Sequence, residues 1–471
     1  MIFPHEKRPY RQLLIFIIAG ATIELLFIAI LSFPRETLST ADVSIYSIMY
    51  TALIAFTSGG LYLLTLFLSY KKGTLYHTVH DRQAHLLLIV IIVFGILFRL
   101  TCLPAWFELS TDIHRYHWDG MVLFHGINPY QYVPTKIHAM LIKSHPNLTD
   151  HITQLLHTIK QHENSLPVYP PFAIVCNTIG YALAPNSTIF IGHRLLYCCA
   201  DIILLFVLAA QLQRRDQPIW WLFLYAWNPL TFTELVGSAH IDGIMLLWWI
   251  LALAQFFEKR PLLSGIFVGM ACLTKYIGLL ALPLLFFEYE KKHRLLFLTG
   301  TIGTILLGYI PFIHAGWGVI ATVRDYYHWN QFNGSIYKLL CITGLSPMGA
   351  KYIGLTLFAG LFSWIMIKRI KPIRATIMLL IGYYLVTPTV HQWYIVWALP
   401  FICFEIWYSV IVFSISILIQ YGILWKYYYS NHTEWTENPL RWALTYIPFF
   451  IFLSIDIYRY FIRKKTPLKN Q

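Results

Sequence analysis

Apolar runs of about twenty residues recur along the whole chain, and each is long enough to cross a hydrocarbon layer of roughly 30 Å as a helix. Of the 471 residues, 57% are hydrophobic and only 12% are charged. Ordinary soluble domains carry roughly a quarter charged residues, so this chain lacks the polar side chains that a water-facing surface needs. Lipid accepts apolar side chains on every side of a helix. The sequence therefore predicts an all-α, polytopic membrane protein.

The basic residues indicate which ends of the runs face the cytoplasm. Of the 35 Lys and Arg residues, 21 lie in seven short clusters between apolar runs. The clusters are residues 7 to 11, 71 to 82, 214 to 215, 259 to 260, 291 to 294, 368 to 374 and 463 to 469. This distribution follows the positive-inside rule and is unlike the basic face of a nucleic-acid-binding protein, despite the net charge of +13. We expect the clusters in the cytoplasm and no nucleic-acid partner.

With those clusters inside, the path of the chain closes with both ends in the cytoplasm. Twelve spans are expected, near 13 to 33, 45 to 69, 86 to 103, 189 to 211, 218 to 237, 240 to 257, 294 to 313, 348 to 367, 373 to 389, 391 to 406, 408 to 425 and 441 to 461. A pair of short helices over 262 to 289 would raise the count to fourteen. The fold class is thus a bundle of about 12 to 14 membrane helices.

Two apolar segments need a special placement. Residues 262 to 289 carry basic clusters at both ends, so we expect a helical hairpin that reverses near Lys275; one long span would instead place residues 368 to 374 outside. Residues 169 to 184 are expected to lie along the outer surface as an interfacial helix that begins at Pro170 and Pro171, where missing amides cost least.

Two polar stretches, 104 to 168 and 314 to 347, then fall on the non-cytoplasmic side. The first is longer than a connection needs, and loops of that length are often functional. We expect an N-terminal transmembrane hairpin over 1 to 84, a catalytic transmembrane module over 85 to 406 with its outer loop at 104 to 188, and C-terminal helices over 407 to 471.

The densest polar group follows the third expected span. If that stretch is helical, Asp112 shares one face with the residues three, four and seven positions later, which are Arg115, Tyr116 and Asp119. An acid, a guanidinium and a phenol would converge there. The alternative is purely structural: a helix N-cap at residues 110 to 112, followed by a helix with an internal ion pair.

Four motifs in this order resemble those of a known family. They are Thr-Asp-Ile-His-Arg-Tyr-His-Trp-Asp-Gly (111 to 120) with Gly-Ile-Asn-Pro-Tyr (126 to 130) and Val-Tyr-Pro-Pro (168 to 171), Trp-Asn-Pro-Leu (227 to 230), Gly-Ser-Ala-His-Ile-Asp (237 to 242), and Thr-Pro-Thr-Val-His-Gln-Trp-Tyr (387 to 394). Together they look like the bacterial polytopic mannosyltransferases of the GT-C superfamily, over about residues 99 to 406.

The resemblance implies an inverting transfer of a hexose, mannose in the first place, from a polyprenyl-phosphate carrier to a lipid or glycan acceptor. It also implies a GT-C-like bundle whose catalytic carboxylate sits in the first outer loop, which matches Asp112. The chain departs from the family pattern in two ways: two spans precede the matching ones, and Thr111 stands where relatives often have a second Asp.

The chemistry agrees with a base at Asp112. A sugar hydroxyl is a poor nucleophile, and a carboxylate that accepts its proton raises the rate about 10² to 10⁴-fold. The leaving phosphate needs positive charge instead, which Arg115 and Lys275 could supply; Arg194 could too, or could snorkel at a helix end. The expected substrate-binding residues are Arg115, Tyr116, Asp119, Tyr169, His240, Asp242, Lys275 and Tyr394.

His391 is the second catalytic candidate, because ionisable groups at a membrane helix end are often functional. It could bind phosphate, orient the acceptor or replace Asp112 as the base, as could Asp119. The histidines of the first outer loop match no zinc-ligand spacing. No cofactor is required by the sequence, although a divalent cation at Asp112 and Asp119 is compatible with it.

A transporter or flippase of lipid-linked sugars is the alternative from another class, but such proteins often consist of repeated halves, and no second half resembles the first. A third interpretation keeps the fold and exchanges mannose for arabinose, aminoarabinose or glucose. The expected location is the bacterial cytoplasmic membrane, with the site facing outside and membrane lipids around the helices.

Overall fold

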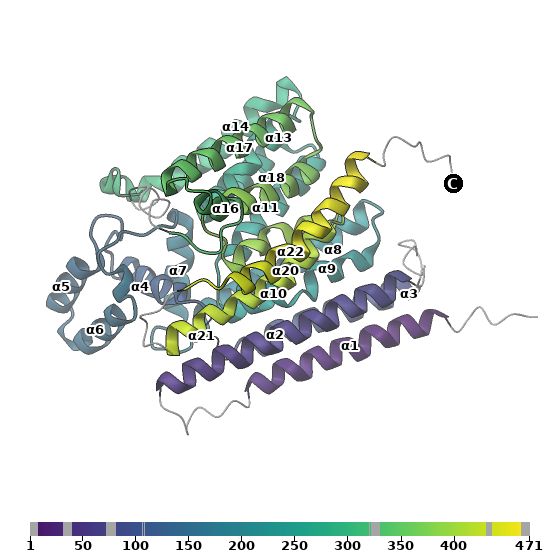
Figure 1. The fold of residues 1–471 in the computed structure, drawn as a ribbon. Helices are drawn as coiled ribbons and strands as arrows, with labels where there is room; N and C mark the ends of the chain where they lie inside the picture. Colours follow the sequence, from purple (N-terminus) through teal and green to yellow (C-terminus); the bar gives the residue numbers. More distant parts are fainter. Residues whose placement is uncertain are drawn as a thin grey trace, which may run out of the picture. The chain divides into compact units, whose positions relative to one another are not determined.

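The computed structural model describes residues 8–31, 40–71, 82–105, 107, 109–319, 321, 330–429 and 436–462. Most of the basic clusters at 71 to 82 and 463 to 469, and part of the polar stretch 314 to 347, lie outside the described residues. Within the described part, the chain is mainly helical and contains no strand; isolated bridges join Phe332 and Asn333 to Thr389. Figure 1 shows the helices in chain order. The predicted all-α class is confirmed.

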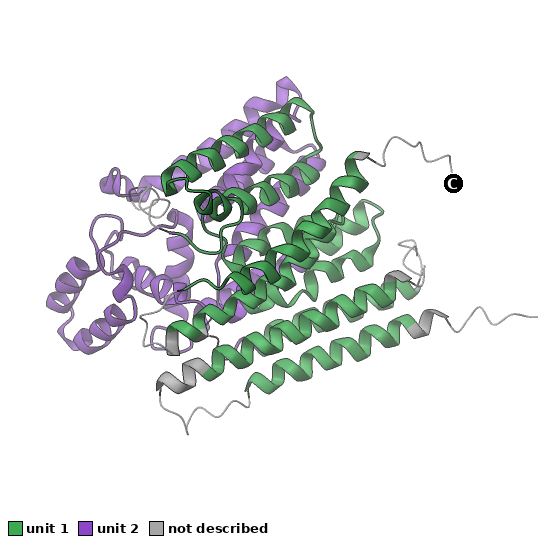
Figure 2. Cartoon of the chain, viewed as in Figure 1, with its two compact units in different colours: residues 1–101, 208–233, 331–471 green, residues 102–207, 234–330 purple. Residues whose placement is uncertain are grey.

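The chain folds into two compact units, coloured separately in Figure 2. Unit 1 comprises residues 1–101, 208–233 and 331–471, and unit 2 comprises residues 102–207 and 234–330. The expected division at residues 84 and 406 stays a prediction. Each unit is built from segments far apart in the sequence, so each depends on long-range packing.

Unit 1 contains the first three long helices and the C-terminal helices. They are α1 (Arg8–Leu31), α2 (Thr40–Lys71), α3 (Arg82–Cys102), α9 (Phe223–Ala226), α10 (Pro229–Phe232), α16 (Ile336–Ile342), α17 (Pro347–Ile367), α18 (Pro372–Val386), α19 (Leu399–Ile402), α20 (Tyr408–Ser416), α21 (Gly422–Tyr429) and α22 (Pro439–Ile457), with short turns η4 (Ile219–Leu222), η8 (Gln392–Ala398), η9 (Ile417–Tyr421) and η10 (Tyr458–Ile462). α1 packs beside α2, as Figure 1 shows.

Unit 2 contains the polar loop and the helices that follow. They are α4 (Asp112–Phe124), α5 (Pro134–Ser144), α6 (Thr149–Thr158), α7 (Pro171–Leu183), α11 (Asp242–Phe257), α12 (Pro261–Thr274), α13 (Ala281–Phe286) and α14 (Lys291–Tyr309), with short turns η2 (Pro146–Leu148), η3 (Lys160–His162), η5 (Thr233–Gly237), η6 (Tyr276–Leu280) and η7 (Ile310–Ala315). α8 (Ile191–Arg214) contributes residues to both units, the last residue of α3 lies in unit 2, and the first residue of η5 lies in unit 1.

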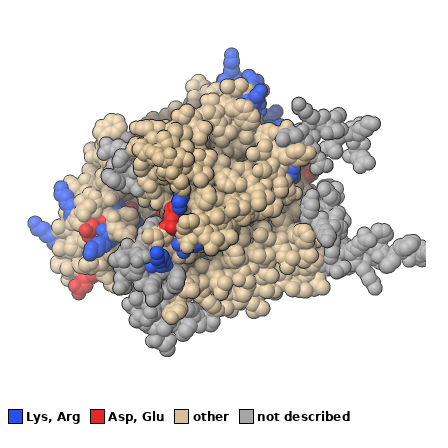
Figure 3. All heavy atoms as spheres, viewed as in Figure 1, with Lys and Arg blue, Asp and Glu red and all other residues tan. Residues whose placement is uncertain are grey.

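Seven described helices are long and apolar enough to span a membrane. They are Gln12–Leu31, Tyr46–Ser69, Gln83–Cys102, Ile191–Arg214, Lys291–Ala315, Pro347–Ile367 and Pro439–Phe461, and the pair Pro229–Gly237 with Asp242–Phe257 would make eight. The remaining expected spans fall on apolar helices of 10–17 residues, so the full count of 12 to 14 stays a prediction. The face seen in Figure 3 is mostly uncharged, with Lys and Arg in small groups, as a lipid-facing surface requires.

The segment 218 to 237 differs from the single span that we expected. It is divided into short helices because Asn228 adopts an extended backbone before Pro229, as a residue preceding proline prefers. The Asn228 side chain accepts the Leu230 amide at 3.1 Å and donates to the Ser414 hydroxyl at 2.7 Å. The Trp-Asn-Pro motif therefore has a structural role within unit 1.

The expected reversal at Lys275 is confirmed. Gly265 meets Phe297, and Leu273 further along α12 meets Gly308 further along α14, so the two helices run parallel. Parallel helices joined in sequence require the chain between them to return, and η6 with α13 makes that return. Both helices start next to basic clusters, which therefore lie at the same end of this helix pair.

Small residues allow α12 and α14 to approach so closely. A Cβ added at Gly265 would lie 2.1 Å from the Phe297 carbonyl oxygen, and one at Gly269 would lie 2.7 Å from the Thr304 side chain. The spacing of these glycines is the Gly-x-x-x-Gly pattern that brings membrane helices together. Backbone contact, more than apolar burial, holds this pair in lipid.

We expect Gly265→Ala to destabilise the protein by about 1–3 kcal/mol, because the added methyl group forces two backbones apart. Gly303→Ala is the matched control on α14, since a Cβ there meets nothing within 4 Å and alanine favours the helix. Thermal unfolding of both variants in detergent measures the difference. Equal melting temperatures would show that close packing of α12 on α14 does not hold the unit together.

Candidate functional site

The polar stretch after α3 forms a helix, α4, which begins at Asp112, so its N-cap falls within residues 110 to 112 as expected. Thr111 occupies the N-cap position without a side-chain hydrogen bond, and the Ser110 hydroxyl accepts the Asp112 amide at 3.2 Å. Arg115 donates from Nε to Asp119 Oδ1 at 2.9 Å. The internal ion pair of the structural alternative is thus present, yet it leaves Asp112 available for other contacts.

Asp112 lies where two tyrosines and a histidine meet. The Tyr116 hydroxyl donates to the Tyr169 hydroxyl at 2.7 Å, and the Tyr169 hydroxyl donates to Asp112 Oδ2 at 3.2 Å. His240 Nδ1 is 3.9 Å from the same oxygen. The Asp112 side chain is 31% exposed whereas that of His240 is 0% exposed, so the carboxylate is the accessible end of this chain of groups.

The two tyrosines are held as hydrogen-bond donors. Burial, together with the nearby Tyr169 and Asp112, raises the pKa of Tyr116 well above its usual value, which keeps its proton in place. Tyr169 precedes the extended Pro170 at the start of α7, and its carbonyl oxygen accepts the Tyr130 hydroxyl at 2.6 Å. The Pro-Pro sequence thereby fixes where Tyr169 points.

A buried carboxylate lies behind His240. Glu234 Oε2 is 3.2 Å from His240 Nε2, and both side chains are 0% exposed. The backbone turns back between them because Ala239 adopts a left-handed conformation with φ of 55°, and the His240 amide donates to the Glu234 carbonyl oxygen at 3.0 Å. Such strain in a residue other than glycine often marks a functional site.

Asp242 and Lys275 form another ion pair in the cluster. Lys275 Nζ is 2.7 Å from Asp242 Oδ1, with side chains 14% and 0% exposed. Lys275 lies at the break between α12 and η6, and its ammonium group is 5.6 Å from the centre of the Tyr169 ring. The buried carboxylate of Asp242 compensates the charge of Lys275 at the end of the apolar helix α12.

Asp119 and Arg115 lie on α4 beside this cluster. Burial raises the pKa of Asp119 to about 6, although the neighbouring Arg115 opposes the shift. Arg115 also donates from Nη1 to the His162 carbonyl oxygen at 3.0 Å. Arg115 therefore ties α4 to the end of the polar loop.

Arg194, considered from sequence as a phosphate ligand or a snorkelling residue, has a structural role. Arg194, 4% exposed, donates from Nη1 to the carbonyl oxygens of Leu103 and Ala105, so it fastens the turn after α3. Burial lowers the pKa of His114 and of His117 to about 4, so both are neutral near pH 7. Among the described residues, no three His, Cys, Asp or Glu side chains are grouped as metal ligands.

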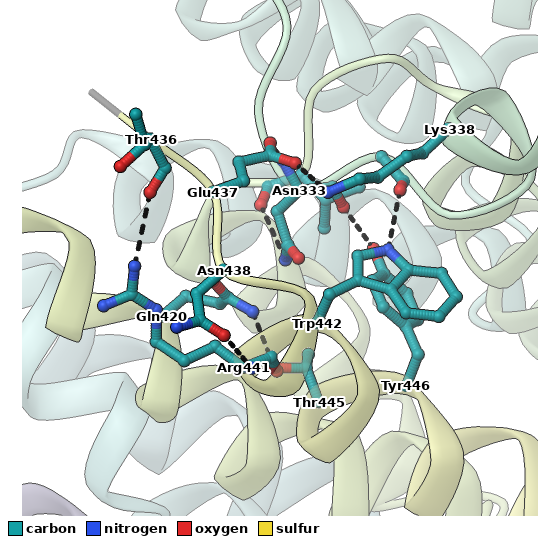
Figure 4. A network of polar contacts seen from close by, with 12 residues as sticks. Asn333, Lys338, Gln420, Thr436, Glu437, Asn438, Arg441, Trp442, Thr445 and Tyr446 are labelled. Carbon is teal, nitrogen blue, oxygen red and sulfur yellow. Dashed lines mark hydrogen bonds and ion pairs between the residues drawn. The ribbon is translucent and has the colours of Figure 1, made fainter. Parts of the chain in front are cut away.

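His391 and Tyr394 belong to unit 1. The His391 ring stacks on Trp393 at 4.3 Å and on Phe332 at 5.2 Å, and it meets Tyr394 edge-on at 5.4 Å between ring centres. The segment that carries Phe332 is fastened to the C-terminal helix, as Figure 4 shows for Asn333. These aromatic contacts fix the His391 ring.

Polar contacts hold the segment around Asn333 to α22 and the residues before it, as Figure 4 shows. Glu437 accepts the Asn333 amide and pairs with Lys338, and the Tyr446 hydroxyl donates to the Asn333 carbonyl oxygen at 2.6 Å. The indole of Trp442 donates to the Gly334 carbonyl oxygen at 3.0 Å. Residues of α22 and the segment before it thus support the surroundings of His391.

The structure brings together Asp112, Tyr116, Tyr169 and His240 directly, with Asp242 and Lys275 adjoining them through the Tyr169 ring. Sequence reasoning missed Glu234. The signal was present, because Glu234 is an acidic residue inside the apolar run 229–237, and an acid in such a run is a functional candidate.

A comparison with protein-family models matches residues 19–289 to the MptA_B family, described as alpha-(1->6)-mannopyranosyltransferase, N-terminal domain. No match was found among proteins of curated function. The matched residues include every member of the cluster around Asp112 and exclude His391. The match spans more than half of the chain, which therefore belongs to the alpha-(1->6)-mannopyranosyltransferase family and is a glycosyltransferase.

Proposed function

We propose that the chain transfers mannose from a polyprenyl-phosphate carrier to a hydroxyl group of a lipid or glycan acceptor, with Asp112 as the general base. The observation that carries this proposal is the cluster in unit 2: Asp112 is a partly exposed carboxylate beside groups that are fully buried. An exposed carboxylate can reach an incoming hydroxyl group, and Asp112 lies among the residues that match a mannosyltransferase family.

The reaction balances with this one base. The acceptor oxygen attacks the anomeric carbon, its proton passes to Asp112, and the bond from that carbon to the phosphate oxygen breaks with its electron pair on the phosphate. The leaving group is already a stable anion and needs no proton. Inversion with an α-linked product, as the family description names, requires a β-linked mannosyl phosphate as donor.

The tyrosines orient the base. Tyr169 donates to Oδ2 of Asp112, which leaves Oδ1 for the acceptor proton. Because Tyr116 in turn donates to Tyr169, the carboxylate has a fixed direction before the acceptor arrives. Pre-organised hydrogen bonds of this kind lower the barrier because no reorganisation is needed in the transition state.

Lys275 is the proposed phosphate ligand. Its ammonium group can donate up to three hydrogen bonds, and one of them goes to Asp242 Oδ1 at 2.7 Å. The side chain is 14% exposed and lies at the reversal of an apolar hairpin, where a prenyl chain could remain in lipid. Arg115 is committed to Asp119 and the His162 carbonyl oxygen, so we propose that it shapes the acceptor side together with Asp119.

We propose His391 as a second catalytic residue and Tyr394 as a substrate-binding residue. The imidazole ring is oriented by stacking on Trp393, which suits a group that binds a phosphate or an acceptor hydroxyl.

The membrane location follows from the apolar helices. We place the active site on the non-cytoplasmic face of a bacterial cytoplasmic membrane because the basic clusters predict that orientation.

We expect Asp112→Asn to abolish mannosyl transfer without changing expression or melting temperature, since the amide keeps the shape but cannot accept the proton. Purified protein in nanodiscs with radiolabelled polyprenyl-phosphate mannose measures this. Asp150→Asn, at an exposed position of α6, is the charge-matched control and keeps full activity. Activity of Asp112→Asn close to wild type would move the base to Asp119 or His391.

Removing Lys275 should weaken donor binding. Lys275→Met leaves Asp242 buried without its charge partner, which costs stability, so the informative variant is Lys275→Met with Asp242→Asn. We expect this double variant to fold and to raise the KM for the donor at least about tenfold, while Asp242→Asn alone changes the KM less. An unchanged donor KM in the double variant would remove Lys275 from the phosphate site.

His391→Ala should lower kcat at least about tenfold, because a positioned imidazole contributes on that scale. The comparison is with His314→Ala, an exposed histidine of η7, which we expect to behave as wild type. Turnover is measured with saturating donor and acceptor. A loss of less than about twofold would make His391 an aromatic packing residue only.

Replacing the donor sugar tests the mannose assignment. The family description names a mannopyranosyl group, and arabinose, aminoarabinose and glucose on the same carrier are the competing donors. Competition assays with these four lipid-phosphate sugars rank them by kcat/KM. A higher value for any sugar other than mannose would replace the donor and keep the chemistry at Asp112.

A further inference from the structure

We propose that Glu234 is a positioning residue for the transfer reaction: it holds His240 so that the imidazole takes the proton from Asp112 after each transfer. The inference rests on the function proposed above and extends it. It assigns a role to a buried acid that neither spacing nor motif singled out, and it explains why an imidazole lies between two carboxylates.

The geometry favours Nε2 as the nitrogen of His240 that carries the proton. Glu234 Oε2 is 3.2 Å from Nε2, and a carboxylate beside a ring nitrogen favours the tautomer with the hydrogen on that nitrogen. In that tautomer Nδ1 carries no hydrogen, and it lies 3.9 Å from Oδ2 of Asp112. That is the atom which can accept a proton from a carboxylic acid.

The distance of 3.9 Å is longer than a hydrogen bond while no substrate is bound. Catalytic contacts are often loose before the substrate is bound and tighten in the complex. Once Asp112 has taken the acceptor proton, its carboxylic acid group is a hydrogen-bond donor and can bond to Nδ1 of His240. Tyr169 donates to Oδ2 and the acceptor proton arrives on Oδ1, so the carboxylic acid group turns about its Cβ–Cγ bond to bring the protonated oxygen to Nδ1 of His240.

The proton balance is closed. The acceptor hydroxyl gives its proton to Asp112, Asp112 gives it to Nδ1 of His240, and the leaving phosphate keeps the electron pair of the broken bond. The imidazolium then lies between the carboxylates of Glu234 and Asp112, which stabilise its charge. Because His240 and Glu234 are 0% exposed and Asp112 is 31% exposed, the proton leaves to water through Asp112 after product release.

The local fold supports this role. The reversal at Ala239, with φ of 55°, brings His240 back toward Glu234. Gly237 in the same segment has no room for a side chain, since a Cβ there would lie 2.9 Å from the Phe107 ring. The segment 234–242 therefore places an acid, an imidazole and the partner of Lys275 at fixed positions on one side of Asp112.

The first experiment separates positioning from a structural role through kinetics. Glu234→Gln keeps the size of the side chain, but its amide can donate to Nε2 and so favours the wrong tautomer. We expect kcat to fall at least about tenfold while the KM values for donor and acceptor stay within about twofold, because neither substrate touches Glu234. Unchanged kcat in a folded Glu234→Gln variant would overturn the proposal.

The second experiment is a double-mutant cycle. If Glu234 acts only through His240, then adding Glu234→Gln to His240→Gln lowers kcat no further than His240→Gln alone. Additive losses in kcat would show that Glu234 has an independent role and would contradict the proposal. Asp456→Asn is the control for losing a buried carboxylate; Asp456 accepts the Ser409 amide at 2.8 Å in unit 1, and its loss should lower the melting temperature with kcat unchanged.

The failure of this inference is distinguishable from failure of the proposed function. If the wild-type protein makes no mannosyl product with any lipid-phosphate donor, the function is wrong. If the wild-type protein transfers mannose, Asp112→Asn does not, and Glu234→Gln turns over normally, the function stands and the role of Glu234 is wrong.

Discussion

The structure depends on the cost of placing charge in an apolar environment. An isolated charge among membrane helices is expensive, so each buried ionisable group needs a partner. Unit 2 meets this requirement with three pairs: Glu234 with His240, Asp242 with Lys275, and Asp119 with Arg115. The pairs lie next to one another around the start of α4, and the one carboxylate left accessible among them is Asp112.

That arrangement links fold and chemistry. The parallel packing of α12 on α14 forces the chain to reverse at Lys275, which brings a cation to the acid at the start of α11. The break before α11 sets Glu234 behind His240 and His240 behind Asp112. The proposed reaction needs cations for the donor phosphate and a base for the acceptor, and unit 2 holds Asp112, Arg115 and Lys275 within one set of helices.

Helical spacing and hydrophobic patterning predicted part of this site. A helix capped within residues 110 to 112 and an ion pair inside it follow from helical spacing, the reversal near Lys275 follows from the basic clusters on either side, and the structure has all three. Glu234 was not foreseen because its contact with His240 depends on a left-handed residue at position 239, which no periodic pattern encodes. Contacts of Asp112 with Tyr169 also arise only when distant segments pack.

The central claim is that Asp112 lies in a catalytic cluster open to the non-cytoplasmic face. The most direct measurement is labelling with a membrane-impermeant maleimide in intact cells, using Thr111→Cys beside Asp112 and Lys292→Cys at the start of α14 in a chain without its native cysteines. Both positions are exposed. The account predicts that position 111 is labelled in intact cells and that position 292 is labelled only after the membrane is permeabilised; the reverse pattern would contradict it.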